Sequence, residues 1–198
     1  DNFCKKNNLI YKFSDTLVTK VSDSVEWANI FFGKFDETFF NIPDFILETI
    51  ITEKQDNFSF RKKNNELSNF FAFVSNKEYS KKDKLILGNQ NVLKARFSDA
   101  QFFLNEDKKI SFSERYAKLS TIVFYDNLGT LQDRSERISD LCKIISKLIS
   151  YNIGRYSKNL VFSNIDLTTE VVKEFPSLQG QVGGYYAKLE GLDSELCD

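Results

Sequence analysis

Histidine and methionine are both absent from the 198-residue chain, and cysteine, proline and glycine are scarce. The absence of histidine excludes Ser-His and Cys-His catalytic dyads and most zinc sites, because these depend on imidazole. Cys4, Cys142 and Cys197 lie far apart in the sequence and form no C-x-x-C pair, so neither a disulfide framework nor a zinc ribbon is favoured. Because the chain lacks an initiator methionine, we expect it to be a piece of a longer protein.

Long apolar runs and an excess of one charge are also lacking. No stretch approaches the ~18–20 apolar residues of a membrane span, and the first ten residues lack the features of a signal peptide. With 27 basic and 28 acidic residues the net charge is −1, so any nucleic-acid surface must be a local patch. The sequence therefore predicts a cytoplasmic protein that does not bind a membrane.

The N-terminal region, residues 1–80, has a mixed α and β pattern. A polar helix is expected from Asp15 to Val25, and Pro43 is expected to start a new element. Residues 45–60 are rich in β-branched and aromatic side chains, and residues 67–76 form a second apolar run. Because Asn64 and Asn65 supply turn chemistry between these runs, the pattern predicts a β-hairpin with one buried face.

Residues 81–198 have the periodicity of helices. Leu93, Phe97, Ala100 and Leu104 form one buried stripe of a helix over residues 91–109, and Ser111 or Ser113 would cap a following helix. A further helix is predicted from about Ser157 to Pro176. The strongest helix lies within residues 133–154, and its expected buried stripe is Ile138, Leu141, Cys142, Ile145, Leu148 and Ile149. The chain is therefore predicted to be α+β, with a mixed region 1–80 followed by a helical domain 81–198.

The residue pattern offers no convincing reaction centre. The phosphate-binding, dinucleotide-binding, zinc-protease and nucleophile-elbow motifs are all missing. Gly180, Gly183 and Gly184 are better explained by a turn with close backbone packing than by a phosphate cradle. Three carboxylates stand beside apolar stripes: Asp99, Asp133 and Asp166. For Asp99, an ion pair with Arg96 one turn away is favoured over an acid–base role.

Basic residues suggest a local nucleic-acid surface. Six of them lie near helix ends and would follow a phosphate backbone if grouped in space: Lys94, Arg96, Lys108, Lys109, Arg134 and Arg137. Tyr185 and Tyr186 would be available for base stacking. From composition alone, the alternative of a solvated helix face is favoured.

Three long segments resemble the β subunit of bacterial heterotetrameric glycyl-tRNA synthetase. Residues 88–109 contain its G-N-x-x-V-L-x-A-R-L-x-D-A-x-F-F stretch, residues 118–138 contain its L-G-T-L-x-D-K-x-x-R-I stretch, and residues 166–187 match its D-L-x-T-x-M-V-x-E-F-P-E-L-Q-G-x-M-G-x-x-Y-A stretch. Two departures stand out: valines replace both methionines of the third stretch, and the family's H-Q-K-Y-F segment keeps only Gln55 and Phe58.

The resemblance implies a β chain that supports glycine attachment to tRNA(Gly) through tRNA binding and scaffolding. A separate α subunit would use ATP and Mg to form glycyl-adenylate, in an assembly of two α and two β subunits. The resemblance also implies that the helical domain is HD-like, with the His-Asp pair falling on Ile165-Asp166. Asp99, Asp133 and Asp166 would then be structural or degenerate positions, without metal or cofactor. Two alternatives are a metal-dependent HD phosphohydrolase and a purely structural helical interaction module.

Overall fold

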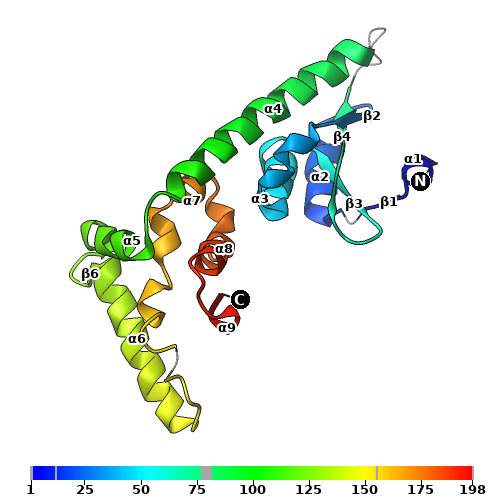
Figure 1. The fold of residues 1–198 in the computed structure, drawn as a ribbon. Helices are drawn as coiled ribbons and strands as arrows, with labels where there is room; N and C mark the ends of the chain where they lie inside the picture. Colours follow the sequence, from blue (N-terminus) through cyan, green and yellow to red (C-terminus); the bar gives the residue numbers. More distant parts are fainter. Residues whose placement is uncertain (1, 12, 77–81, 155, 198) are drawn as a thin grey trace. The chain divides into compact units, whose positions relative to one another are not determined.

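The computed structural model describes residues 2–11, 13–76, 82–154 and 156–197. It separates into two compact units, residues 1–102 (the N-terminal unit) and residues 103–198 (the C-terminal unit). The division into a mixed region, residues 1–80, and a helical domain, residues 81–198, stays a prediction. A small antiparallel sheet together with many helices confirms the α+β class (Figure 1). No helix in the described ranges is long and apolar enough to cross a membrane.

The N-terminal unit is built on a four-stranded antiparallel sheet in the order β1-β3-β4-β2. Its strands are β1 (Leu9–Ile10), β2 (Asn29–Lys34), β3 (Phe58–Lys62) and β4 (Leu67–Ser75). Asn65 turns the β3–β4 hairpin with a positive φ of 68°, which asparagine tolerates. The predicted hairpin is therefore confirmed for residues 58–62 and 67–75.

Helices complete this unit: α1 (Asn2–Asn7), α2 (Asp15–Asp23), the 3₁₀ helix η1 (Glu37–Asn41), α3 (Asp44–Thr49) and the π-helix η2 (Ile50–Lys54). The predicted α2 is confirmed, and Ser14 caps it by accepting a hydrogen bond from the Leu17 amide. Strand structure for residues 45–57 is wrong. Ile46, Leu47, Ile50 and Ile51 are all 0% exposed, and their i, i+1, i+4, i+5 spacing is helical, which overrides β propensity.

Helix α4 (Lys82–Asp107) supplies apolar side chains from the predicted stripe. Leu93, Phe97 and Ala100 are fully buried in the core, and Leu104 is buried further along the helix. The Phe97 ring packs edge-on against Phe35, with ring centroids 5.0 Å apart. The stripe is therefore confirmed, although the helix begins at Lys82 rather than near residue 91.

Short helices dominate the C-terminal unit. These are α5 (Phe112–Lys118), η3 (Leu119–Thr121), α6 (Leu131–Leu148), η4 (Leu160–Phe162), η5 (Ile165–Thr168), α7 (Glu170–Glu174), η6 (Pro176–Leu178), α8 (Gln181–Leu189) and α9 (Ser194–Cys197). A small hairpin joins β5 (Val123–Tyr125) to β6 (Gly129–Thr130). Ser111 caps α5 in a reciprocal capping box with Glu114, which resolves the predicted choice between Ser111 and Ser113.

Two helix predictions in this unit need correction. The helix expected from Ser157 to Pro176 is broken into η4, η5 and α7, because Thr169 adopts an extended backbone and caps α7 with its side chain. Helix α6 forms as predicted but ends at Leu148, and Ser150 follows with a positive φ.

The predicted buried stripe of α6 is wrong for four of its six residues. Leu141, Ile145, Leu148 and Ile149 are each more than half exposed, whereas Ile138 and Cys142 are half-buried. The face that is buried instead carries mostly small side chains: Leu131, Ser135, Ser139 and Ser146. Serines let the backbone of η4 approach α6 closely, so the chain packs against the polar-small face and leaves the large apolar side chains outside.

Candidate functional site

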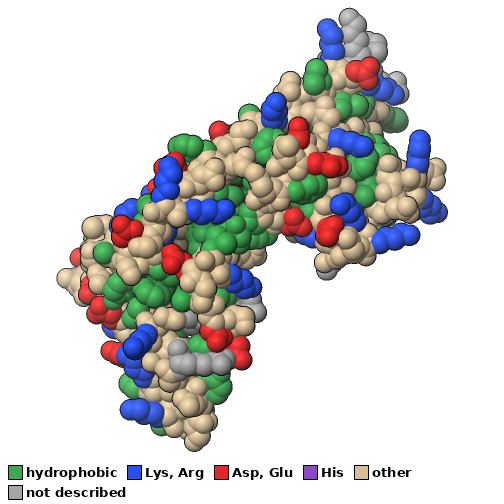
Figure 2. All heavy atoms as spheres, in the orientation of Figure 1, with side chains coloured by type: hydrophobic (Ala, Val, Ile, Leu, Met, Phe, Trp, Pro, Cys, Tyr) green, Lys and Arg blue, Asp and Glu red, His purple; other side chains and the backbone are tan. Residues whose placement is uncertain are grey.

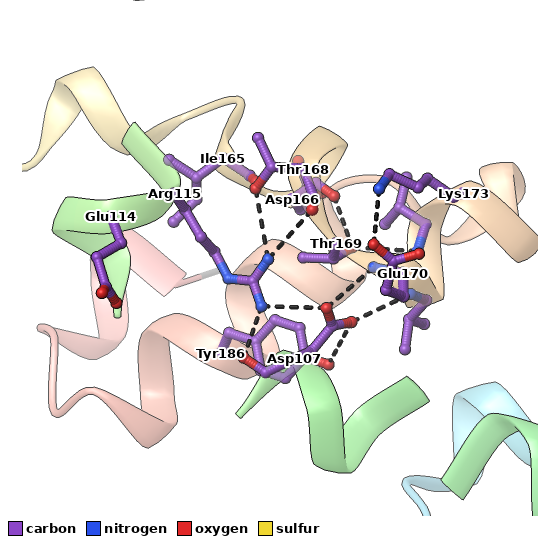
Figure 3. Close-up of polar contacts among 12 residues, drawn as sticks. Asp107, Glu114, Arg115, Ile165, Asp166, Thr168, Thr169, Glu170, Lys173 and Tyr186 are labelled. Atoms are coloured by element: carbon purple, nitrogen blue, oxygen red, sulfur yellow. Dashed lines mark hydrogen bonds and ion pairs between the residues drawn. The ribbon is translucent and has the colours of Figure 1, made fainter. Parts of the chain in front are cut away.

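A buried ion pair lies at the centre of the C-terminal unit (Figure 3). The Asp107 and Arg115 side chains are each 1% exposed, and their nearest charged atoms are 3.1 Å apart. The same guanidinium donates to the Asp107 carbonyl oxygen at 2.6 Å and to the Thr168 carbonyl oxygen at 3.3 Å. Arg115 thereby joins α5 to the end of α4 and to η5.

The Asp107 carboxylate accepts three further hydrogen bonds. The Glu170 and Val171 amides donate to it at 2.9 and 3.1 Å, where the first turn of α7 leaves amides unpaired. The Tyr186 hydroxyl of α8 donates at 3.1 Å, and both burial and the Asp107 charge raise the pKa of Tyr186. Because every lone-pair direction of the carboxylate is used internally, Asp107 can hold the fold together but has no acceptor to offer a substrate.

Asp166 of η5 is a second buried carboxylate, 2% exposed, and it contacts the N-terminus of α8. It accepts a hydrogen bond from the Gly180 amide at 2.6 Å, and Gly180 has a φ of +88° that favours glycine. A side chain at Gly183 would place its Cβ 3.2 Å from the Asp166 carboxylate. Burial raises the pKa of Asp166, and the hydrogen bonds from the Gly180 and Gly183 amides offset part of that rise.

These contacts explain the glycine cluster. The Asp166 carboxylate accepts a hydrogen bond from the Gly180 amide at the α8 N-terminus, which is the kind of amide that a phosphate cradle uses. A Cβ on Gly184 would clash with the Cys197 carbonyl oxygen, so this glycine also marks close backbone packing. The close backbone packing predicted for this glycine cluster is therefore confirmed.

The other two predicted carboxylates are exposed. Asp133 forms a reciprocal capping box with Thr130, whose amide and hydroxyl donate to it and lower its pKa. Asp99 and Arg96 are both exposed, and the described coordinates contain no ion pair between them, so that predicted pair is wrong. Within the residues described here, no three His, Cys, Asp or Glu side chains are grouped to hold a metal ion.

The six predicted basic residues divide between the units. Lys94 and Arg96 lie on α4 in the N-terminal unit, whereas the other four belong to the C-terminal unit. Arg134 is half-buried: it donates to the Asn164 side chain at 2.9 Å, and its guanidinium lies 4.9 Å from the Phe124 ring centroid. Arg137 is exposed one turn later. The structure thus brings Arg134 and Arg137 together on α6, and tRNA contact by all six residues stays a prediction.

Lys108 and Lys109 follow the end of α4 and are exposed. The Lys108 ammonium lies 5.9 Å from the Tyr185 ring centroid, and Lys109 pairs with Glu106. Tyr186 is only 5% exposed and bonded to Asp107, so its predicted availability for base stacking is wrong. Tyr185 is half-buried beside it.

Comparison with known proteins identifies the family. A family model described as the glycyl-tRNA synthetase beta subunit matches residues 1–198. The chain belongs to the glycyl-tRNA synthetase beta subunit family. A glycine–tRNA ligase beta subunit from Pseudoalteromonas atlantica is 35% identical over 187 residues, which is 94% of this chain and 27% of that protein. This match confirms the family resemblance seen in the three segments.

Other relatives agree in name and extent. The glycine–tRNA ligase beta subunit of Buchnera aphidicola is 37% identical over 187 residues, and that of Neisseria meningitidis serogroup C is 34% identical over 184 residues. The chain spans about 27% of the length of the curated relatives it matches. Neither the phosphohydrolase nor the purely structural alternative is favoured by these names, and the HD-like character of the helical unit stays a prediction.

The sequence of this beta subunit family member did not predict the buried ion pair between Asp107 and Arg115. Both lie inside or next to the matched segments, yet their eight-residue separation crosses a helix end and has no periodic meaning. The one usable signal was indirect: a charged side chain beside apolar positions can be buried only with partners that compensate its charge.

Proposed function

We propose that this chain is a region of the β chain of a glycine–tRNA ligase. In this proposal it supports ATP-dependent attachment of glycine to tRNA(Gly) by contacting tRNA and by scaffolding the subunits, and it does not itself activate glycine. The observation that carries the proposal is the match to glycine–tRNA ligase beta subunits across 94% of the chain. The partners would be tRNA(Gly) and a catalytic α subunit, in a cytoplasmic assembly of two α and two β subunits.

The chemistry of the buried residues supports the non-catalytic part of this proposal. Among the residues that the structure describes, the buried charged side chains are Asp107, Arg115 and Asp166, and each is bonded to protein groups. Catalysis of adenylate formation needs charged groups free to stabilise a reacting phosphate, as well as a bound nucleotide and metal. We assign ATP and Mg to the α subunit, and no cofactor to this chain.

A pyrophosphate-exchange assay tests this division. The purified 198-residue chain, incubated with ATP, Mg, glycine and labelled pyrophosphate, should show no glycine-dependent exchange. The same chain plus a beta-subunit-free preparation of the α subunit should show exchange at the rate of the α subunit alone. Exchange by this chain by itself would overturn the proposed division of labour.

The tRNA surface is tested most cleanly at Arg137, because Arg134 also supports Asn164 and its loss would disturb the fold. Replacing Arg137 with Ala in the assembled synthetase should lower the slope of log affinity against log salt by about 0.7–0.9, the effect of one lost phosphate contact. The loss should be similar for all tRNA sequences, because phosphate contacts do not distinguish bases.

Lys147 offers a matched control, since it is an exposed cation near the other end of α6. Lys147→Ala should leave the salt slope unchanged. An Arg137→Ala slope equal to that of the parent would remove Arg137 from the tRNA surface, and equal loss in both variants would indicate a diffuse charge effect.

A further inference from the structure

The C-terminal half of α6 presents a continuous apolar face outside the packed part of its unit. Four side chains form it, and we call them the α6 seam: Leu141 (56% exposed), Ile144 (56%), Ile145 (51%) and Leu148 (79%). In the lower part of Figure 2, green hydrophobic side chains lie at the surface among blue Lys and Arg side chains. Large aliphatic groups clustered in water on a folded chain mark a surface made for contact.

The spacing along α6 identifies the kind of surface that would cover the seam. Leu141, Ile145 and Leu148 follow one another at intervals of four and three residues, and Leu141, Ile144 and Leu148 at intervals of three and four. Alternation of three and four residues is the pattern of a helix that packs lengthwise against another helix. The opposite face of α6, lined by Ser135, Ser139 and Ser146, is already buried against its own unit. A second helix is therefore the shape that fits the free side.

Charge limits how far that helix extends along α6. Arg137 precedes Leu141 by four residues and Arg134 precedes it by seven, so both arginines continue the seam toward the N-terminus of α6. Arg134 donates to Asn164 within its own unit, and Arg137 is the exposed side chain proposed above to contact tRNA. The partner helix would therefore cover the apolar half of this face and leave the arginine half open.

We propose that the α6 seam is covered by an amphipathic helix from the rest of the same polypeptide. This inference rests on the proposed function, because it places the chain within a longer β chain. The curated relatives have 27% of their length in the matched region, so almost three quarters of each relative is available to supply such a helix. A segment in the same polypeptide has a high effective concentration, which favours it over a separate molecule.

Photocrosslinking in the full-length gene product tests the occupant. A benzoylphenylalanine placed at Ile145 is irradiated in a sample mixed from ¹⁴N- and ¹⁵N-labelled protein, and the crosslinked peptides are mapped by mass spectrometry. The expected product joins Ile145 to a peptide outside residues 1–198, with both peptides carrying the same isotope. The control position is Lys147, which is exposed on another side of α6 and should give little crosslinking to that peptide.

Each other outcome overturns the proposal in a distinct way. Mixed-isotope products would mean that a second copy covers the seam, products with another protein would mean a separate subunit, and products with tRNA would make α6 part of the nucleic-acid surface. A probe that reacts only with solvent would mean that the face is uncovered. Aminoacylation of tRNA by the protein without benzoylphenylalanine, measured in parallel, tests the proposed function separately.

Stability supplies a second readout. Replacing Leu148 with Glu should lower the melting temperature of the full-length gene product by ~2–4 °C, because the replacement puts a charge into a helix–helix contact. Lys147→Glu, at the neighbouring exposed position, should leave it within about 1 °C. Equal melting temperatures for the two variants would contradict a buried seam.

Discussion

The two units bury different kinds of side chains. Of the twelve buried polar or charged residues in the described part of the chain, only Thr49, Asn57 and Ser68 belong to the N-terminal unit, and the other nine belong to the C-terminal unit. All three buried charges are among those nine. The N-terminal unit instead fills its core with phenylalanine rings and branched aliphatic side chains.

This contrast teaches where each unit is vulnerable. Apolar burial is non-directional, so a core of rings and aliphatic groups tolerates a change of shape at moderate cost. A buried ion pair depends on geometry, and removal of one partner leaves the other charge uncompensated. We therefore expect the C-terminal unit to fail at single polar positions where the N-terminal unit would adjust.

The largest effect is expected at Arg115. Arg115→Met should destabilise the chain by about 3–5 kcal/mol, because Asp107 would stay buried without its cation. Urea denaturation followed by circular dichroism measures the cost. Arg137→Met, at an exposed arginine, is the control and should cost less than ~0.5 kcal/mol. A cost below about 1 kcal/mol at Arg115 would break the comparison between the units.

A smaller effect is expected from the ring at the centre of the N-terminal core. Phe71 is 0% exposed, and Phe71→Leu should cost about 1–2 kcal/mol because the replacement stays apolar and neighbouring rings can shift. The same denaturation experiment applies. Phe102→Leu, at a position 59% exposed, provides the matched control. A loss at Phe71 as large as that at Arg115 would show that both cores are equally intolerant.

Acid should weaken the caps of the C-terminal unit. Hydrogen bonds from Ser111 and Thr130 lower the pKa values of Glu114 and Asp133 below their ordinary values of 4.5 and 3.8. The contribution of these two carboxylates to the free energy of unfolding is complete when the pH lies above their ordinary pKa values. It is lost as the pH falls through the lower pKa values of the folded state. Denaturation midpoints followed downward from about pH 6 should therefore fall less steeply in the double variant Glu114→Gln, Asp133→Asn, whose caps do not titrate.

Lys62–Glu66 in the N-terminal unit provides a contrast for this experiment, because Glu66 also has a lowered pKa but caps no helix. Glu66→Gln should change the acid dependence without changing the helix content. If the double cap variant keeps the full acid dependence of the parent, the caps do not carry the pH response.

The smallest effect is expected at Asp99. Because this exposed carboxylate makes no ion pair with Arg96 in the described coordinates, Asp99→Ala should change stability by no more than about 0.5 kcal/mol. Thermal unfolding of the variant beside the parent is sufficient. A drop of several degrees would restore the ion-pair hypothesis.

Much of the fold was predictable where local pattern and packing agree. The α4 stripe, the α2 helix, the Ser111 cap and the β3–β4 hairpin all follow from spacing or turn residues. The strand prediction for residues 45–57 is wrong because their β-branched composition favours a strand, whereas the spacing of Ile46, Leu47, Ile50 and Ile51 is helical. Periodicity was the better guide there.

The candidate site was less predictable, for two physical reasons. The Asp107–Arg115 pair connects separate helices, so its geometry depends on tertiary packing that no local pattern encodes. Helix α6 shows the opposite difficulty: its amphipathic pattern is real, but the large apolar side chains face away from the unit and small serines face inward. A pattern predicts that a face is to be covered, and it does not say by which part of the protein.

The two parts of α4, around Leu93 and around Asp107, are expected to depend on different units for their protection from hydrogen exchange. Residues around Leu93 are packed into the N-terminal unit, whereas Asp107 holds the first amides of α7 in the C-terminal unit. Amide hydrogens exchange with solvent when the cooperative unit that protects them opens. Deuterium uptake near Leu93 should therefore follow the opening of one unit, and uptake at Glu170 and Val171 the opening of the other. Hydrogen-exchange rates along and next to this one helix should therefore report two separate opening events.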